Sequence, residues 1–458
     1  MTGAPAARRG GLRAIAMGCV ALCGSLAAAG AAAQATAAAG RGVGATVPYV
    51  THDGDTLYAI SQQYLQGADD WRQVARLNGV PAPKRLQRGL AIRLPAARLR
   101  TVLLAARPVA MHGAVERAGR TTAFGPLAAD ATLGEGDRLR TGADGFVTLE
   151  LTDGTHLSLP PDSEIGLTAL HRTVLTQTLS RIIDLKRGSV DSDVTHMKRP
   201  DDRFQIRSPS VVAGVRGTRF RVNYDALGDA RTRVEVLAGT VGVGPARRLD
   251  PTLVHANFGS IAAADGQVDT PVPLLDAPTL VKPGRVQDAV QVGFDLVPPA
   301  GGQAYHVQIA SDAGFLDVLR EMRVATPQAR FDGVPDGSYF VRIAAIDANG
   351  LEGQVRTYGF ERRRFDLHAE AGPASGGYAF RWMPGRAAAG VTTRYRFVLS
   401  ASADLSNPIV DQPGMADTRM VIAHLPPGDY YWSVSAEQFD GGRFYEKAGT
   451  VNSFTLAR

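Results

Sequence analysis

The sequence predicts a mainly β protein with several domains, and three observations support this. Short runs of alternating apolar and polar residues recur from residue 108 onward, separated by many of the 51 glycines and 27 prolines, which is typical of strands joined by turns. A segment at 337–350 is repeated at 428–441. Helical spacing stands out in residues 47–96. The chain has 458 residues, a length that favours about three domains after an N-terminal targeting segment is removed.

Residues 1–35 have the pattern of a signal peptide. Three arginines between positions 8 and 13 precede the apolar run Ala14–Ala29, and small residues at Ala33 or Ala35 suit cleavage. The run is shorter than the ~20 residues that span a bilayer. We therefore expect export to the periplasm or cell wall and no transmembrane helix in the mature chain. An uncleaved N-terminal anchor is the alternative.

The cysteine positions and the net charge exclude some classes of function. Both cysteines, Cys19 and Cys23, lie in the predicted signal, so the mature chain has no thiol and no disulfide. The formal charge is +6, from 50 basic and 44 acidic residues, and it falls to +3 without the three signal arginines. This small excess gives no reason to expect a nucleic-acid partner.

Residues 47–96 predict a small βααβ module. A strand at Tyr49–Thr51 is followed by a turn at Gly54, and Asp55 is placed to cap a helix that begins at Thr56. A second helix begins after Asp69–Asp70. The pair Asn78–Gly79 ends this helix because both residues tolerate a left-handed backbone, and the alternation of Leu90, Ile92 and Leu94 predicts the closing strand.

This module resembles the LysM family. The resemblance rests on Tyr49-Val50, Gly54 to Leu57, Ile60, Trp71, Leu77-Asn78 and Gly89 to Pro95. It implies binding of peptidoglycan or another N-acetylglucosamine polymer between two loops. The residues implied are Gly54, Asp55, Thr56 and Leu57 in the first loop, and Asn78, Gly79 and Val80 in the second.

Each of these residues also has a structural interpretation. In this interpretation Asp55 and Asn78 are helix caps and do not bind a glycan. Trp71 has helical spacing with Val74 and is a core residue. Lys84, Arg85 and Arg88 can favour anionic wall polymers or belong to a solvated loop.

Residues 96–107 are predicted to be a linker, and residues 108–245 a β domain. Phe146–Leu151 alternates as a strand, and Asp153–Gly154 is a hairpin signal. The stretch Ser208–Phe220, which contains VAGVRGTRF, resembles the FecR family. Members of that family relay a signal from an outer-membrane receptor to a cytoplasmic sigma factor. They carry a cytoplasmic segment and a spanning helix that this chain does not show, so only the periplasmic fold and a protein-contact role are expected.

Two residues of this stretch are candidate partner contacts. The guanidinium of Arg216 can bind a partner carboxylate, or it can tie a turn by donating to backbone carbonyls. Thr218 can contact the partner or stabilise the same turn.

Residues 246–283 are predicted to be a partly ordered connector. Residues 284–362 and 363–458 then read as two β-sandwich repeats that resemble fibronectin type III domains in size and strand order. Three aromatic residues, Tyr339, Tyr431 and Trp432, can form a contact face or, as alternate strand residues usually do, a core.

The sequence contains no catalytic motif and no clustered metal ligands. We therefore expect no catalytic residues, no metal and no cofactor. The function predicted is that of a non-catalytic envelope protein that binds peptidoglycan through its first module and presents its other domains to an envelope protein partner. The alternative is a FecR-like periplasmic signalling component.

Overall fold

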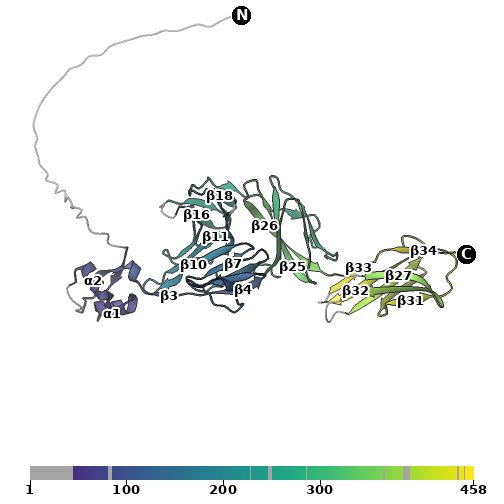
Figure 1. Ribbon diagram of the computed structural model, residues 1–458, viewed down its shortest axis with the longest axis horizontal. Coiled ribbons are helices and arrows are strands. Elements are labelled where there is room, and N and C mark those ends of the chain that lie inside the picture. Colours follow the sequence, from purple (N-terminus) through teal and green to yellow (C-terminus); the bar gives the residue numbers. More distant parts are fainter. Residues whose placement is uncertain are drawn as a thin grey trace, which may run out of the picture.

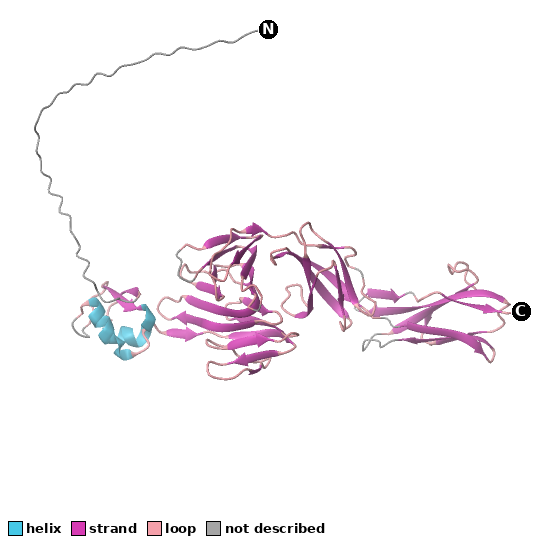
Figure 2. Cartoon of the chain, turned by 45° about the horizontal axis from the view of Figure 1, so that its top comes forward, coloured by secondary structure: helices cyan, strands magenta, loops and turns pink. Residues whose placement is uncertain are grey.

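The computed structural model describes residues 45–80, 85–226, 228–245, 250–284, 286–364, 367–384, 392–440, 443–447 and 449–457. The predicted signal peptide and both cysteines lie outside these residues. Strands dominate, which confirms the mainly β fold class, and the helices are confined to the N-terminal module (Figure 2). No helix in the described part of the chain is long and apolar enough to cross a membrane.

The N-terminal module has the predicted βααβ order (Figure 1). Its elements are β1 (Thr46–Val50), α1 (Leu57–Tyr64), α2 (Trp71–Asn78) and β2 (Ala91–Pro95), with 3-10 turns at Ala68–Asp70 and Ala96–Arg98. The two strands are antiparallel, with Tyr49 opposite Ile92. Leu57, Ile60 and Val74 pack beneath them in one apolar core, and Trp71 contacts the edge of that core.

The cap of α1 differs from the prediction. Thr56, and not Asp55, is the N-cap: its backbone is extended and its Oγ1 accepts a hydrogen bond from Ala59 N at 3.0 Å. The helix begins one residue later than predicted, which moves the capping position to Thr56. Asp55 instead closes the preceding loop, where its Oδ2 accepts from His52 N at 2.7 Å and from the Tyr49 hydroxyl at 2.9 Å.

A continuous hydrogen-bonded sheet of 17 strands forms the middle β domain, residues 101–273. Its strands are β3 (Thr101–Leu103), β4 (Ala106–His112), β5 (Val115–Ala118), β6 (Gly125–Pro126), β7 (Arg138–Thr141), β8 (Phe146–Leu151), β9 (His156–Leu159), β10 (Glu164–Thr173), β11 (Leu179–Asp193), β12 (Arg203–Arg207), β13 (Val212–Val215), β14 (Arg219–Tyr224), β15 (Thr232–Ala238), β16 (Thr240–Gly244), β17 (Thr252–His255), β18 (Phe258–Ala262) and β19 (Val272–Pro273).

The long strand β11 joins the two parts of this sheet. Its first half pairs with β10 and β12, and its second half pairs with β14 and β9. Gly188 lies at the change of partner with φ +79°, and a Cβ there would come within 2.4 Å of Ser163 Oγ, so the close approach requires glycine.

The structure shifts both boundaries of the middle β domain. Residues 96–107, predicted to be a linker, contain β3, which pairs with β10, and Leu99, which packs into the N-terminal module. Residues 246–283, predicted to be a connector, contain β17, β18 and β19, which pair with the strands before them. These strands are short and lie in segments rich in proline and small residues, so their sequences alone do not predict them.

Two sandwiches follow, and they repeat one topology. In the first, β20 (Thr279–Leu280), β21 (Val292–Val297) and β24 (Gln328–Phe331) face a sheet of order β23-β22-β25-β26, formed by Val318–Val324, Ala304–Ala310, Gly337–Ile346 and Glu352–Arg362. In the second, β27 (Leu367–Ala374), β28 (Gly377–Pro384) and β31 (Arg419–Ile422) face β30-β29-β32-β33, formed by Val410–Met415, Thr393–Ser400, Gly428–Asp440 and Arg443–Lys447. The last strand, β34 (Asn452–Leu456), pairs with β32.

The internal repeat predicted from sequence is confirmed by this topology. Its two copies of the central strand, β25 and β32, begin at Gly337 and Gly428, the first residues of the two matched segments. Trp432 is buried in the second core, and Tyr339 and Tyr431 are half-buried. Trp432 is therefore a core residue and not part of a contact face.

The first sandwich docks on the middle β domain through two apolar contacts. Phe146 packs with Phe315 and Val318, and Leu351 packs with Ile261 and Leu274. Figure 1 shows the two domains side by side, while the N-terminal module and the second sandwich lie at opposite ends.

Between the two apolar contacts lies an interdomain ion cluster, which comprises Asp191, Arg221, Glu235, His306, Glu321, Arg323, Arg342 and Glu352. At its centre Arg221 bonds Asp191 at 3.0 Å in its own domain and Glu352 at 3.1 Å in the sandwich. His306 Nδ1 lies 3.0 Å from Glu352, and Glu352 N donates to Glu235 Oε1 at 3.2 Å. Arg221, Glu235 and Glu352 are each at most 3% exposed.

Burial and the ion pairs act against each other on the pKa values of this cluster. Burial raises the pKa of Glu235 to about 7, an effect that Arg221 only partly offsets. Burial acts to raise the pKa of Glu352, but Arg221 and His306 hold it well below its usual range. Burial acts to lower the pKa of His306, yet the Glu352 carboxylate raises it above its usual value.

Replacing Glu352 with glutamine should weaken the docking of the first sandwich. Glu352→Gln leaves Arg221 and His306 buried beside a neutral group, which costs about 3 kcal/mol. We expect faster native-state hydrogen exchange in β15 and β26. Asp411→Asn is the matched control, because its pair with Arg396 is 34–44% exposed and should change stability by less than ~1 kcal/mol. Equal effects of the two substitutions would contradict a docking role for the cluster.

Docking should also weaken as the pH rises from about 5 to 8. The folded pKa of Glu235 lies above its unfolded value, so its contribution is complete below ~4.5 and is lost as the pH passes about 7. The pKa of His306 is also raised, so its contribution to stability falls as the pH rises above the usual pKa of histidine. The pKa of Glu352 is lowered, so its contribution to stability is lost only at acidic pH.

The variant Glu235→Gln isolates one group in this pH dependence. It should match the native protein in the melting temperature at pH 5 and exceed it at pH 8, because the amide stays neutral. A slope of melting temperature against pH that is unchanged by Glu235→Gln would show that Glu235 does not titrate in this window.

Candidate functional sites

The first loop of the implied glycan site contacts the segment that leads into β2. Leu86 N donates to Asp55 O at 2.9 Å, and Thr56 and Arg85 form a bridge, so the segment after α2 returns to the first loop. Gly54 and Gly79 are exposed and have left-handed backbones, with φ +87° and +65°. A Cβ at either position would meet nothing within 4 Å, so the space beside each Cα is open.

The side chains among the seven residues implied as glycan-binding have structural roles. Leu57 is in the core, Thr56 caps α1 and Asp55 closes the first loop. Burial and the hydrogen bond to Asp55 raise the pKa of Tyr49, which keeps its hydroxyl a donor in that loop. Val80 packs against the edge of the core.

Asn78 has more contacts than a helix cap requires. Its Nδ2 donates to Val74 O and to Arg93 O, both at 2.8 Å, and its Oδ1 accepts from Arg93 N at 2.6 Å. The side chain thereby ties the end of α2 to strand β2. Among the implied residues, the groups left for a ligand are the backbone of Gly54, the carbonyl of Gly79 and the exposed part of Val80, because the Gly79 N–H donates to Ala75 O.

In the middle β domain, Arg216 and Thr218 bond within the protein. Arg216 donates to the carbonyls of Pro200 at 3.0 Å and Arg199 at 3.1 Å, while its side chain remains at the surface. Thr218 is 4% exposed and donates to Thr240 O at 3.2 Å. The structure therefore places Thr218 inside the domain and gives Arg216 a bracing role between two loops.

These contacts hold the segment between β11 and β12 in place. Val194 N donates to Thr218 O and Met197 N donates to Arg216 O, at 3.1 and 3.2 Å. Gly217 has φ +121°, and a Cβ there would come within 2.7 Å of His196 Cα. We call residues 194–202 the braced loop, because its position depends on the VRGT stretch.

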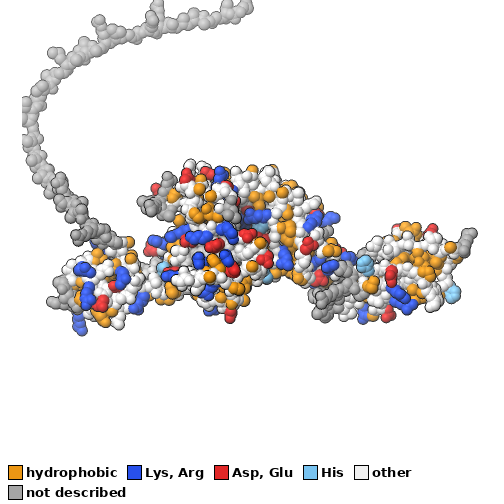
Figure 3. Space-filling model, viewed as in Figure 1, with side chains coloured by type: hydrophobic (Ala, Val, Ile, Leu, Met, Phe, Trp, Pro, Cys, Tyr) orange, Lys and Arg blue, Asp and Glu red, His pale blue; other side chains and the backbone are white. Residues whose placement is uncertain are grey.

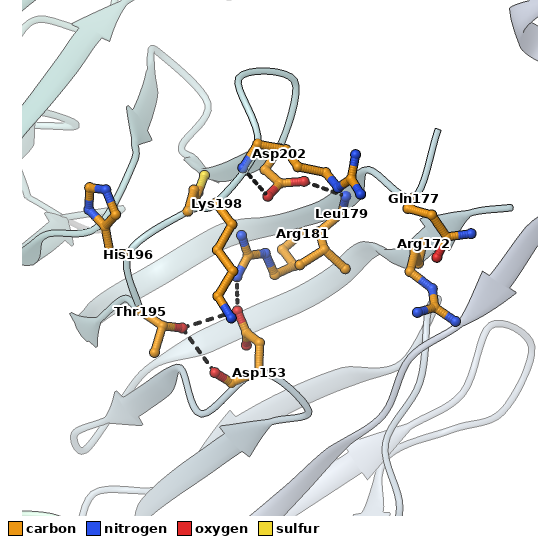
Figure 4. A pocket seen from close by; sticks show the side chains of 11 residues that line it. Asp153, Arg172, Gln177, Leu179, Arg181, Thr195, His196, Lys198 and Asp202 are labelled. Carbon is orange, nitrogen blue, oxygen red and sulfur yellow. Dashed lines mark hydrogen bonds and ion pairs between the residues drawn. The ribbon is translucent and has the colours of Figure 1, made fainter. Parts of the chain in front are cut away.

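The braced loop separates two surface cavities. One has a volume of about 440 Å³ and is lined on its other side by the VRGT stretch and Leu253. The second, of about 540 Å³, lies between the braced loop, the β8–β9 turn and the start of β11 (Figure 4). A band of Lys and Arg side chains, interspersed with acidic ones, crosses the visible face of this domain (Figure 3).

Sequence reasoning missed the second cavity, although Arg181 carries a signal for it. Arg181, Ile183 and Leu185 alternate along β11 and are all buried, so a charged residue occupies a core position of a strand. A charge at such a position needs a partner or a function.

These features define a class: an elongated β protein in which a small βααβ module, a large β domain and two sandwiches follow one another. The family comparison then identifies the large domain. Residues 137–242 match the sequence model of the FecR protein family, a range that contains β11, the braced loop and the VRGT stretch. No curated protein sequence shows a significant match to the chain.

Solved structures give partial likenesses. A protein of Parabacteroides distasonis ATCC 8503 that is described as an anti-sigma factor is 18% identical to this chain, with a TM-score of 0.25. The match covers 30% of this chain, and this chain spans 59% of that protein. A two-domain fibronectin type III segment of chicken tenascin is 14% identical with a TM-score of 0.23, and the match covers 40% of this chain and all of that one.

Replacing Asn78 with alanine should destabilise the N-terminal module. Asn78→Ala removes three hydrogen bonds and leaves Arg93 N–H and two carbonyls without their partner, a loss of about 1–3 kcal/mol. Hydrogen exchange in α2 and β2 measures it. Gln63→Ala on the exposed side of α1 is the control and should change little. Equal exchange in the two variants would contradict the tie between α2 and β2.

Proposed function

We propose that this protein is an exported, non-catalytic envelope protein that binds peptidoglycan, or another N-acetylglucosamine polymer, through its N-terminal module. The observation that carries the proposal is the contact of the first loop with the segment after α2 in a βααβ fold, together with the exposed glycines Gly54 and Gly79. Acetamido groups are bound by backbone donors and acceptors together with a small apolar contact, which Val80 offers. The site needs no charged side chain, which agrees with a neutral sugar ligand.

The other domains would present protein-binding surfaces at the position that the module selects. The middle β domain and the first sandwich share a buried ion cluster and so act as one body, which suits a role in display. Arg216 braces a loop that is exposed at His196 and Lys198, so partner contact would fall on the braced loop and less on Thr218.

A second function is favoured by the match of residues 137–242 to the FecR protein family. In this alternative the chain is a periplasmic component of a signalling system, and the middle β domain contacts a receptor or regulator. Deletion of the gene should then alter transcription of a small set of genes. An unchanged transcript profile, measured under envelope stress and metal limitation, would argue against a regulatory role.

Sedimentation with purified sacculi tests the glycan proposal. The full mature chain should co-sediment with sacculi, and a chain lacking residues 45–95 should remain in the supernatant. Digestion of the sacculi with a muramidase should release the bound protein. Equal retention of the two chains would refute anchoring by this module.

A point variant sharpens the same experiment. Gly79→Asn adds a side chain at the exposed second loop, and asparagine is one of the few residues that keep the left-handed backbone that ends α2. We expect unchanged folding and about fivefold or greater loss of sacculus binding, the scale of about 1 kcal/mol. Gln63→Asn on the exposed side of α1 serves as the control, and equal binding by the two variants would place the glycan elsewhere.

A further inference from the structure

The second cavity of the middle β domain contains a buried arginine whose bonding is incomplete. Arg181 is 1% exposed, and its Nη1 donates to Asp153 Oδ2. Its Nε and Nη2 are buried and have no hydrogen-bond partner among the described residues. A buried donor without an acceptor costs about 1–3 kcal/mol, and more when it is charged, so this arrangement favours a missing acceptor.

The two unpartnered atoms form one edge of the guanidinium. Nε–H and one Nη2–H point in the same direction, and two parallel N–H groups match the two oxygens of a carboxylate. The ring of Phe204 lies 5.7 Å from the guanidinium carbon and restrains its plane. Burial lowers the pKa of Arg181, an effect that an anion at this edge would oppose.

The acidic groups around the cavity are already engaged. Asp153 accepts from Arg181, Thr155 and Thr195, and Asp202 accepts from the backbone of Leu179 and Arg199 (Figure 4). By contrast, the rim cations Arg172, Lys198 and Arg199 are exposed, and none has an ion-pair partner in the described part of the chain. The lining therefore has an excess of positive charge that is free to meet an anion.

We propose that this cavity binds a small organic carboxylate, such as the C-terminal carboxylate of a short peptide, through the Nε–Nη2 edge of Arg181. The lining also contains Leu179 and buried Met197, which suit an apolar substituent. The volume of about 540 Å³ accommodates a ligand of dipeptide size. Asp153 disfavours a doubly charged phosphate at the same edge, because its carboxylate binds the same guanidinium.

The site is independent of glycan binding by the N-terminal module. Asp153 comes from the β8–β9 turn, Arg172 from β10, Arg181 from β11 and Lys198 from the braced loop. The braced loop is held by Arg216, so the VRGT stretch positions one wall of the cavity. The VRGT stretch therefore contributes to the shape of the cavity without lining it.

Nitrogen-15 NMR of the arginine Nε–H signals in the full mature chain tests the proposal. The probes are N-acetyl-L-alanyl-L-alanine, its C-terminal amide, and inorganic phosphate. We expect the dipeptide acid to shift the Arg181 signal in a saturable way, and the amide to leave it unchanged. No shift with the acid, an equal shift with the amide, or tighter binding of phosphate would overturn the assignment.

Variants separate the buried fork from the charge of the rim. Arg181→Lys keeps the charge and removes the fork, so affinity for the acid should fall by about tenfold or more. Lys198→Ala alters an exposed side chain, leaves folding intact and should weaken binding about two- to fivefold. Lys186→Ala, exposed on the same strand, should have no effect. Loss of affinity with Lys186→Ala, or full affinity without Lys198, would contradict this geometry even if Arg181→Lys does not fold.

Discussion

The arrangement of the middle β domain and the first sandwich depends on the ion pair between Arg221 and Glu352. Each group is almost fully buried, and each comes from a different domain. Removing two ions from water costs several kcal/mol apiece, and their attraction offsets this only in good geometry. The pair is therefore strong evidence for one relative orientation of the domains and weak evidence for added stability. A small shift would separate the two buried charges and leave each with the partners of its own domain, such as Asp191 for Arg221 and His306 for Glu352.

Strand β11 carries two charged residues with different roles, Arg181 and Asp191. Asp191, in the second half of β11, pairs with Arg221 and Arg342 at the domain interface. Arg181, in the first half, lines a cavity, and its Nε and Nη2 have no hydrogen-bond partner among the described residues. Strand β11 thus carries a half-buried aspartate that is paired across the domain interface and a buried arginine whose hydrogen bonding is incomplete. The contrast separates a structural ionic group from a candidate binding group.

Sequence patterns predicted the local elements well, because local physics determines them. The alternation of Ile92 and Leu94, the helix end at Asn78–Gly79 and the repeat that begins at Gly337 and Gly428 all appear as predicted. The cap at Asp55 was wrong by one residue, since capping depends on which residue is the last extended one. Strands β17 to β19 were missed because pairing with other strands, and not local preference, orders them.

The interdomain ion cluster was not predictable from any single domain. Arg221, Glu235 and His306 lie in strands whose alternation marks them as outward-facing, and for an isolated domain this would mean contact with water. A second domain covers them, and only the three-dimensional arrangement shows that the polar faces match. Arg181 is the opposite case, because its inward position on β11 is readable from sequence. A charged residue in phase with Ile183 and Leu185 therefore deserved a site prediction, whereas Arg216, the residue that motif resemblance favoured, braces the loop beside it.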